Sequence, residues 1–158
     1  MNVSVIPANP SHTTAILELL AQICRFHSLA RPDIFKPDGK KYTSLDLELM
    51  YHDKDCPIFV AVSDSGEVLG YAFCKVFHNE DSSVLVPNKR LYLDDLCVDE
   101  NHRSMGIGRK LMEYVISYAR EIGCHNLDLN VWCFNENARR FYESFGMSPS
   151  HVYLEKLL

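Results

Sequence analysis

The sequence predicts an α/β fold in one domain that spans residues 1–158. Residues 58–62 and 68–77 are apolar segments separated by a short polar turn, a pattern typical of an antiparallel hairpin. Residues 91–98 form a further apolar strand that leads through a glycine-containing turn into a strongly amphipathic helix. With 158 residues, 47% of them hydrophobic, the chain can bury one sizeable core.

The first third of the chain is predicted to contribute one strand and two helices. Residues 3–6 alternate as a strand, and Ser11 is a candidate N-cap for the first helix. The apolar face of that helix consists of Ile16, Leu19, Leu20 and Ile23. Thr43 or Ser44 opens the second helix. Its apolar residues are Leu45, Leu49 and Met50.

The second half alternates strands and helices. The helix that begins near Gly108 gathers its apolar residues on one face and stops at Gly123. Residues 127–132 alternate as a strand, and a helix follows over residues 137–145. Residues 151–157 are predicted to form the last strand.

Charge and hydropathy argue against two classes of partner. A formal net charge of −5 and an isoelectric point near 5.8 come with no basic stripe that could follow a nucleic-acid backbone. Residues 1–10 lack a secretion signal, and no segment approaches the ~18 consecutive apolar residues of a membrane span. We therefore expect a cytoplasmic protein that has neither a nucleic-acid nor a membrane partner.

The spacing of cysteine and histidine predicts no metal site. The six cysteines contain no Cys-x-x-Cys pair and stand mostly in apolar segments, so they are interpreted as reduced core thiols. The seven histidines are dispersed and form no cluster with cysteine of the kind that binds zinc.

Residues 103–108, Arg-Ser-Met-Gly-Ile-Gly, form the most informative segment because they join the strand at 91–98 to the following helix. Glycine allows a sharp turn and a close approach by a ligand, and the free N–H groups at a helix N-terminus favour an anion. Leu111 stands where a dinucleotide-binding motif has its third glycine, and no Gly-Lys-Ser/Thr sequence is present. The segment indicates an anion cradle, with a plain turn as the alternative.

A second motif follows at residues 135–147, Asn-Glu-Asn-Ala-Arg-Arg-Phe-Tyr-Glu-Ser-Phe-Gly-Met. In order and separation, the two segments resemble the Arg/Gln-x-x-Gly-x-Gly/Ala and Asn-x-x-Ala-x-x-Phe-Tyr-x-x-x-Gly-Phe motifs of the GNAT superfamily of N-acetyltransferases. Met147 replaces the usual final Phe. The resemblance covers residues 91–158 and implies a GNAT fold. In that fold a central mixed, mostly antiparallel sheet is splayed at the acetyl-CoA site and flanked by helices.

The resemblance also implies acetyl-CoA as co-substrate, without a metal. The pantetheine arm would pair with the main chain of Leu96, Cys97 and Val98, where the strand leaves its neighbour. The remaining implied contacts of acetyl-CoA are Arg103, Ser104, Met105, Gly106, Ile107, Gly108, Arg109, Asn135 and Ala138. For Arg109 a solvated position on the helix is the alternative, and for Asn135 the alternative is a helix N-cap.

Tyr142 matches the family position of the general acid that protonates the sulfur of CoA as it leaves, and it also counts as a contact of acetyl-CoA. A phenol near pKa ~10 can protonate a developing thiolate near ~8.5 once the two groups are positioned. The alternative is a core aromatic residue that shares a helix face with Ala138 and Phe145.

Asp94 is the preferred candidate for the base and for a contact with the substrate, by similarity to polyamine-type relatives that have Leu-Glu-Asp at this place. Adjacent strand residues point to opposite faces, so only one of Asp94 and Asp95 is expected to face the cleft. A structural role for both carboxylates is the alternative. Asn130 could orient the amine and Trp132 could line the cleft.

These expectations converge on a transferase that moves an acetyl group to a primary amine of a small molecule by direct attack. Pro32 and Pro37 make residues 30–41 irregular, and this stretch is expected to form a wall on the substrate side. An acceptor that is a protein N-terminus or lysine is the first alternative. A non-catalytic acyl-CoA sensor is the second. A homodimer is a further expectation, because dimers are common among proteins of this family.

Overall fold

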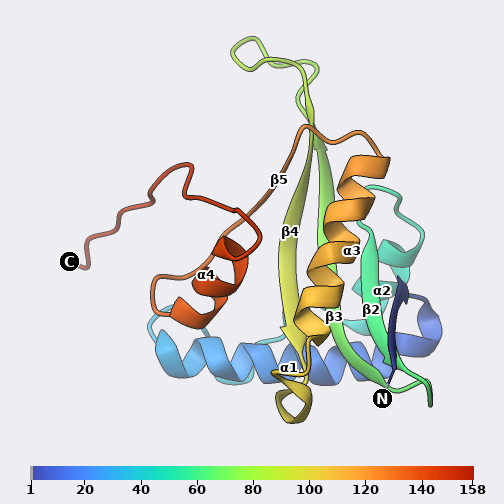
Figure 1. Cartoon of the computed structure of the whole chain (residues 1–158). Coiled ribbons are helices and arrows are strands. Elements are labelled where there is room, and N and C mark those ends of the chain that lie inside the picture. Colours follow the sequence, from blue (N-terminus) through green and yellow to red (C-terminus); the bar gives the residue numbers. More distant parts are fainter. Residues whose placement is uncertain (1) are drawn as a thin grey trace.

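A computed structural model describes residues 2–158, in which five strands form one sheet and four α-helices surround it (Figure 1). The strands are β1 (Val3–Pro7), β2 (Ile58–Ser63), β3 (Val68–His78), β4 (Lys89–Val98) and β5 (Asn126–Leu129). The helices are α1 (Thr13–Ala30), α2 (Ser44–Tyr51), α3 (Ile107–Glu121) and α4 (Glu136–Glu143). Short 3-10 turns at Pro10–His12 and Glu100–His102 precede α1 and follow β4.

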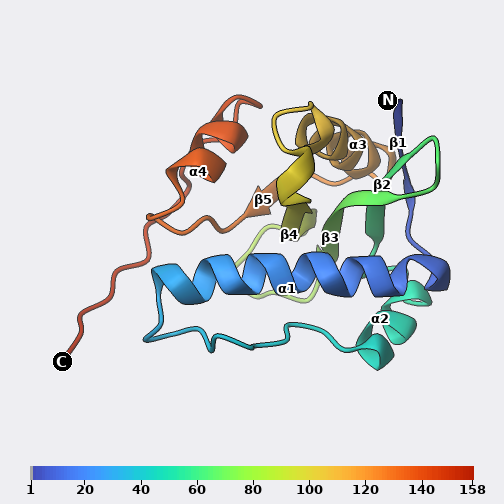
Figure 2. The ribbon, with the colours of Figure 1, turned by 90° about the horizontal axis from the view of Figure 1, so that it is seen from below.

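The sheet separates two apolar layers (Figure 2). On one face, α3 buries Leu111, Met112 and Val115 completely against residues of β3 and β4. On the other face, α1 buries Ile16, Leu19 and Leu20, as its periodicity predicts, and α2 adds Leu47. Both faces of the central strands are therefore covered, which makes the sheet a rigid platform for the site.

The sheet is mixed and mostly antiparallel, as expected, and its strands follow the order of the chain. The strands β1 to β4 pair antiparallel, whereas β4 and β5 are parallel. The parallel pairing runs only from Arg90 opposite Asn126 to Leu93 opposite Leu129. Beyond Leu93, β5 no longer accompanies β4, so the sheet is splayed at this edge.

A β-bulge in β4 marks the point where this pairing ends. Phe73 of β3 stands opposite Asp95 and Cys74 stands opposite Leu93, which leaves Asp94 as the extra residue. A bulge interrupts the alternation of side chains along a strand. This irregularity determines how the two aspartates are arranged in the site.

The helix starts differ in part from the sequence predictions. Thr43 caps α2 as predicted, in a capping box with Asp46. Ser11 is not the N-cap of α1, because Asn9 caps the 3-10 turn and α1 begins at Thr13. The apolar residues expected on α2 differ in burial. Leu45 and Leu49 are exposed and Met50 is partly buried against the core, whereas Leu47 is the fully buried one.

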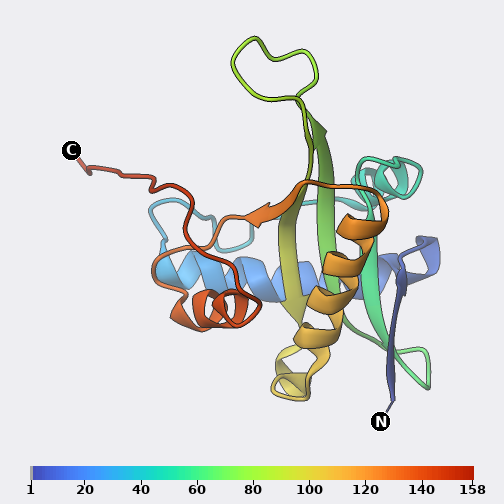
Figure 3. The ribbon, with the colours of Figure 1, turned by 45° about the horizontal axis from the view of Figure 1, so that its top comes forward.

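Two strand predictions were also wrong in part or in full. The strand β5 ends at Leu129, three residues before Trp132, because the chain then turns toward α4. Residues 151–157 form no strand, since the segment after α4 extends away from the sheet and finds no neighbour to pair with (Figure 3). The hairpin of β2 and β3 and the helix α3 match their predicted positions.

Two findings concern membrane-spanning helices and metal sites. None of the helices in residues 2–158 is long and apolar enough to cross a membrane. The same residues contain no cluster of three or more His, Cys, Asp or Glu arranged to hold a metal ion, and all six cysteines are free thiols.

Candidate active site

The free half of β4 provides an edge along which an extended ligand could lie. Leu96 and Val98 point toward the α3 layer, and Cys97 is buried in the α1 layer. Because β5 pairs only as far as Leu93, the main chain of these three residues has no strand partner on its β5 side. The predicted pantetheine contacts therefore lie where the two strands have separated.

The loop after β4 leads to the start of α3 through two residues in the left-handed region. Ser104 has φ 63° and Gly106 has φ 79°. Gly106 is also the N-cap of α3 and offers no side chain to its first turn, so the N–H groups there stay available to a ligand. Arg103 reaches back and donates from Nε to the carbonyl of Val98 at 3.3 Å. Met105 is exposed at the tip of the loop.

The start of α3 faces α4. A Cβ at Gly108 would lie 3.5 Å from the ring of Phe141 and 3.6 Å from Val98. Arg109 places its guanidinium 5.0 Å from the centre of the Phe145 ring and lies 3.8 Å from the carboxylate of Glu113. The predicted loop contacts and α4 thus border one region of the molecule.

The residues of α4 have both structural and site-facing positions. Asn135 is the N-cap, and its Oδ1 accepts a hydrogen bond from the N–H of Ala138 at 3.1 Å. Tyr142 is largely buried, and Asp95 and Cys97 both contribute to the shift of its pKa. Burial, helped by the charge of Asp95, raises the pKa of the Tyr142 phenol well above its usual value. Tyr142 is therefore protonated at neutral pH.

Asp94 and Asp95 do not point to opposite faces, as the rule of alternation predicted. The bulge turns both side chains toward Lys41, whose Nζ lies 3.1 Å from Asp94 and 3.3 Å from Asp95. We expected only one of them to face the cleft, whereas both side chains reach Lys41, because a single sequence gives no signal for a bulge at this position.

The two carboxylates differ in their surroundings. Asp94 accepts a hydrogen bond from Tyr42 at 2.6 Å and lies 3.4 Å from Lys75. Burial alone would raise the pKa of Asp94, but the Tyr42 hydrogen bond and the Lys41 charge outweigh it and lower the pKa. Asp95 is more deeply buried and its added partner is the Tyr71 hydroxyl at 3.3 Å. Burial raises the pKa of Asp95 despite Lys41.

Lys41 and Tyr42 come from the segment between α1 and α2, which was expected to wall the substrate side. The charges of both aspartates raise the pKa of Lys41 even though burial works in the opposite sense. The sequence analysis did not single out Lys41, Tyr42, Tyr71 or Lys75. Their contacts with the aspartates join residues that are 19 to 54 positions apart in the chain, and no local pattern reports such contacts.

An aromatic cluster joins the end of α1 to the segment after β5. Its members are Phe26, His27, Phe35, Trp132 and Phe134. Trp132 and Phe134 stack with ring centres 5.9 Å apart, and Arg31 lies 5.9 Å from the centre of the Trp132 ring. Trp132 is still 38% exposed, so it belongs to the cluster without being enclosed by it. Burial in the cluster lowers the pKa of His27, and the charge of Asp95 acts in the opposite sense.

Asn130 lies at the edge of this region. Its side-chain amide donates to the Tyr92 hydroxyl at 3.0 Å, so the amide is already partnered. The role of Asn130 in orienting the amine stays a prediction, and the hydrogen bond to Tyr92 would fix the direction of its side chain.

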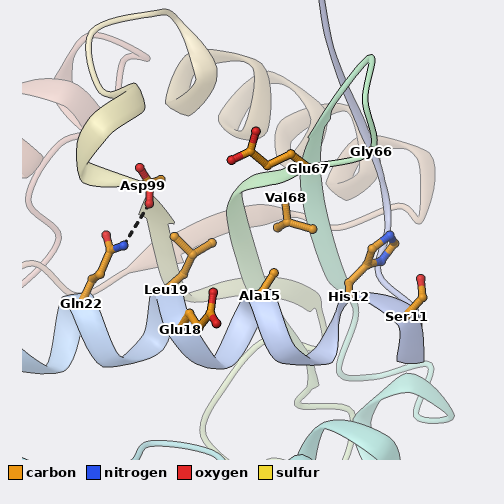
Figure 4. A pocket seen from close by; sticks show the side chains of 10 residues that line it. All are labelled: Ser11, His12, Ala15, Glu18, Leu19, Gln22, Gly66, Glu67, Val68 and Asp99. Carbon is orange, nitrogen blue, oxygen red and sulfur yellow. Dashed lines mark hydrogen bonds between the residues drawn. The ribbon is translucent and has the colours of Figure 1, made fainter.

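A cavity of about 550 Å³ lies elsewhere, between the first half of α1 and the turn from β2 to β3 (Figure 4). Its lining includes His12, Glu18 and Glu67, and at one end Gln22 donates to Asp99 at 2.9 Å. None of the predicted site residues lines this cavity. It nevertheless adjoins the end of β4, because its lining includes Asp99 and Leu19, whose carbonyl accepts a hydrogen bond from the Cys97 thiol at 3.8 Å.

Comparisons with known proteins point in the same direction as the motifs. A profile of the acetyltransferase (GNAT) family matches residues 20–147. Streptothricin acetyltransferase of Streptomyces lavendulae is 35% identical over 96 residues, which are 61% of this chain and 47% of that protein. Spermine/spermidine N(1)-acetyltransferase of Bacillus subtilis strain 168 is 29% identical over 98 residues, 59% of this chain and 62% of that protein. The match thus spans less than two thirds of either relative.

Solved structures share the whole architecture. The BH1408 protein from Bacillus halodurans, solved as a tetramutant, is 27% identical with a TM-score of 0.93, over 98% of this chain and 99% of that chain. Glucosamine-6-phosphate N-acetyltransferase from Arabidopsis thaliana has a TM-score of 0.73 over 99% of both chains. At 18% identity, that second likeness shows the fold alone.

Proposed function

This chain belongs to the acetyltransferase (GNAT) family, and we propose that it moves the acetyl group of acetyl-CoA to the primary amine of a small molecule. The observation that carries the proposal is the separation of β4 from β5 after Leu93, directly before the loop that opens α3. An unpaired strand edge and an uncapped helix N-terminus there suit a ligand with an amide-bearing arm and a pyrophosphate.

The donor side offers partners for two parts of acetyl-CoA, the pantetheine arm and the pyrophosphate. The pantetheine amides would pair with the main chain of Leu96 to Val98 as an additional strand does. The pyrophosphate would accept hydrogen bonds from the first N–H groups of α3, beside Gly106 and Gly108, with charge supplied by Arg103. Asn135, whose Oδ1 is used for capping, keeps its side-chain NH2 group for a contact with the arm.

We propose direct transfer, in which the neutral amine attacks the thioester carbon and the bond from carbon to sulfur then breaks. Tyr142 would give its phenolic proton to the departing thiolate. Its raised pKa keeps the phenol protonated at neutral pH but makes the transfer to a thiolate near ~8.5 uphill, so the transfer depends on close positioning of the two groups. Cys97 lies nearby, but burial raises the pKa of its thiol to about 12. A thiol of this kind is a poor nucleophile, which favours transfer without a covalent enzyme intermediate.

The amine must lose a proton before it attacks, and we propose that the aspartate pair accepts this proton through water. Asp94 is the candidate that the sequence favours. Asp95 is the candidate that the electrostatics favour, because its raised pKa makes it the stronger base of the two and because it lies near Tyr142. The alternative is that both carboxylates only hold Lys41 in place.

For the acceptor we propose a cationic small molecule. The aspartate pair supplies negative charge, and the partly exposed Trp132, whose ring already lies beneath the Arg31 guanidinium, supplies an aromatic surface of the kind that binds cations. The names of the relatives, which act on streptothricin and on spermine or spermidine, support small amines in general. Lys41 already holds its ammonium between the two carboxylates, so the acceptor would have to compete with it or bind beside it.

Two measurements test this proposal. Calorimetry should detect binding of CoA to the protein, and an absence of binding would end the proposal for both the enzyme and the sensor. A screen of polyamines, aminoglycosides and peptides should then reveal release of CoA thiol from acetyl-CoA with one class of amine. Turnover with peptides alone would favour a protein acceptor, whereas CoA binding without any turnover would favour the acyl-CoA sensor.

A further inference from the structure

Lys41 brings a primary amine of the chain itself into the candidate site. Its Nζ lies 3.1 Å from a carboxylate oxygen of Asp94 and 3.3 Å from one of Asp95. It also donates a hydrogen bond to the main-chain carbonyl of Asp94, at the β-bulge, at 3.1 Å. This amine therefore already stands beside both carboxylates that are proposed to take a proton from the acceptor.

The main chain that carries Lys41 has no regular structure. Residues 31–43 run from the end of α1 to the start of α2 through turns and loop (Figure 2). The side chain of Lys41 remains 34% exposed, and its four-carbon stem can change rotamer. Nζ is therefore tethered to the site without being enclosed in a packed core.

The order of the proposed donor contacts along β4 places the acetyl group near the same aspartates. The pyrophosphate is proposed at the start of α3, beyond Val98, and the pantetheine arm along residues 96–98. In CoA the thioester lies at the far end of that arm from the pyrophosphate. Successive residues of a strand advance by ~3.3 Å, so an arm that runs back along β4 carries the thioester toward Asp95 and Asp94.

We propose that the protein acetylates its own Lys41 when no acceptor is bound, with Nζ taking the acetyl group from the acetyl-CoA in the same molecule. This inference rests on the proposed function, because it uses the same donor and the same aspartates. A nucleophile that is tethered beside the reacting carbon needs no separate binding step, which favours its reaction. Acetylation would also remove the positive charge that Asp94 and Asp95 share.

The transfer balances with groups of the site alone. The ammonium of Lys41 first gives one proton to an aspartate, and the Nζ lone pair then bonds to the thioester carbon. The bond from carbon to sulfur breaks, and its electron pair goes to the sulfur. Tyr142 protonates this thiolate and regains a proton from the new amide nitrogen. The products are Nζ-acetylated Lys41, the thiol of CoA and one proton on the aspartate.

The transfer is expected to be slow. Burial would lower the pKa of Lys41, but the charges of Asp95 and Asp94 outweigh it and raise the pKa. The neutral amine is therefore scarce at neutral pH. An acceptor that displaces Nζ from the carboxylates would be acetylated first, so the modification of Lys41 should build up when acetyl-CoA is the only substrate present.

Mass spectrometry of the full-length protein after incubation with acetyl-CoA alone tests the inference. We expect a gain of one acetyl group, located on Lys41 by peptide mapping. K41R should lower the uptake by at least about tenfold, because a guanidinium keeps the positive charge between the carboxylates but stays protonated and does not attack. K40R is the matched control, since it changes the exposed lysine next in the chain and should leave the uptake unchanged.

The kinetics distinguish transfer within the site from a direct chemical reaction of acetyl-CoA with surface lysines. The rate per molecule should not depend on protein concentration, should saturate with acetyl-CoA and should fall when CoA is added as a competitor. Acetylation of Lys40 as fast as Lys41, or a rate that rises without saturation, would overturn the inference. A rate per molecule that grows with protein concentration would overturn it too, because one copy would then acetylate another.

The inference and the proposed function fail in different ways. Unmodified Lys41 in a protein that binds CoA and acetylates an added amine overturns the inference and leaves the proposed function in place. A protein that binds no CoA overturns both.

Discussion

The two halves of β4 follow different rules. From Arg90 to Leu93 the strand is paired on both sides, to β3 and β5, and its side chains alternate between a buried leucine and a residue on the other face. From Asp94 to Val98 the strand begins with a bulge, places two adjacent aspartates on one face and has no partner on the β5 side. One half completes the sheet, whereas the other is open to a ligand.

This difference shows how one strand can support both stability and chemistry. The paired half buries Leu91 and Leu93 in the core, and the pairing of β5 with β4 ends at Leu93. The open half is not flexible as a result, because β3 pairs with it as far as Val98 opposite Gly70. At Gly70 a Cβ would stand 2.7 Å from the carbonyl of Cys97, so glycine is required for that close pairing. The open edge is therefore a rigid one.

The largest effect is expected beside the open half, at Tyr142. Tyr142→Phe removes the proposed proton donor and should lower kcat by about 10²–10⁴-fold, with CoA affinity nearly unchanged. Tyr114→Phe on α3 is the matched control, because it also removes one phenol, from a partly buried side chain that packs against Phe59 and has no proposed part in the reaction. Steady-state kinetics measure kcat, and calorimetry measures CoA affinity, for both variants. Normal turnover in Tyr142→Phe would assign Tyr142 to the core.

In the paired half the expected loss is of stability. Leu91 is completely buried, so Leu91→Ala should lower the free energy of unfolding by about 2–5 kcal/mol through lost burial and an added cavity. Because no ligand contact is proposed for its side chain, kcat per folded molecule should stay unchanged. Denaturant unfolding and active-site titration measure the two quantities. A large loss of kcat in the folded variant would mean that the halves are not independent.

The sequence could predict the paired half and the donor side because their signals are local. Periodicity placed α3 and its buried Leu111, Met112 and Val115, and the glycines placed the turn before it. The bulge at Asp94 could not be predicted, because a bulge depends on the partner strand and leaves no pattern in the sequence of its own strand. The same holds for Lys41 and the aromatic cluster, whose contacts join segments distant in the chain.

The C-terminal tail, residues 148–158, illustrates the reverse case, in which a local pattern predicts an element that the structure lacks. Its alternating sequence predicts a strand, but strand formation also needs a neighbour, and the described chain offers none that the tail reaches. The sequence therefore indicates that these residues favour an extended strand, but it does not indicate which strand they could pair with. Trp132 is similar, since the alternating pattern continued past Leu129, where β5 ends and the strand loses its pairing.

A smaller effect is expected at the loop that the open half leads into. Gly106→Val should weaken CoA binding on the order of tenfold, because φ 79° strains a residue with a branched Cβ and the first turn of α3 would shift. Gly66→Val in the turn between β2 and β3 is the matched control, with φ 83° and the same open surroundings. Both variants should lose similar stability. Equal CoA affinity in both would show that the loop is only a turn.

The smallest effect is expected at the aspartates, where the bulge puts both candidates for the base on one face. The residue that relays the amine proton through water should, when changed to Asn, lower kcat/KM by less than the ~10²–10⁴-fold of a directly acting group. The loss should be greatest near neutral pH and should shrink as rising pH supplies neutral amine. If the carboxylate with the raised pKa is the base, Asp95→Asn shows this profile and Asp94→Asn does not. The reverse result would favour Asp94, which the sequence resemblance selects.

Melting curves give an independent reading, because the two pKa shifts have opposite signs. The folded state lowers the pKa of Asp94, so its carboxylate stabilises the fold above the unfolded pKa near ~3.9, and Asp94→Asn should lower Tm at neutral pH. The folded state raises the pKa of Asp95, so its ionisation costs stability as pH rises above ~4, and Asp95→Asn should raise Tm at neutral pH unless Lys41 loses its place. The difference for Asp95 should fade as pH falls below the unfolded pKa near ~3.9, whereas the difference for Asp94 should persist until the pH falls through its lowered pKa in the folded state. A pH–rate change confined to the variant with the raised Tm would identify Asp95 as the base and leave Asp94 as the residue that holds Lys41 and Tyr42.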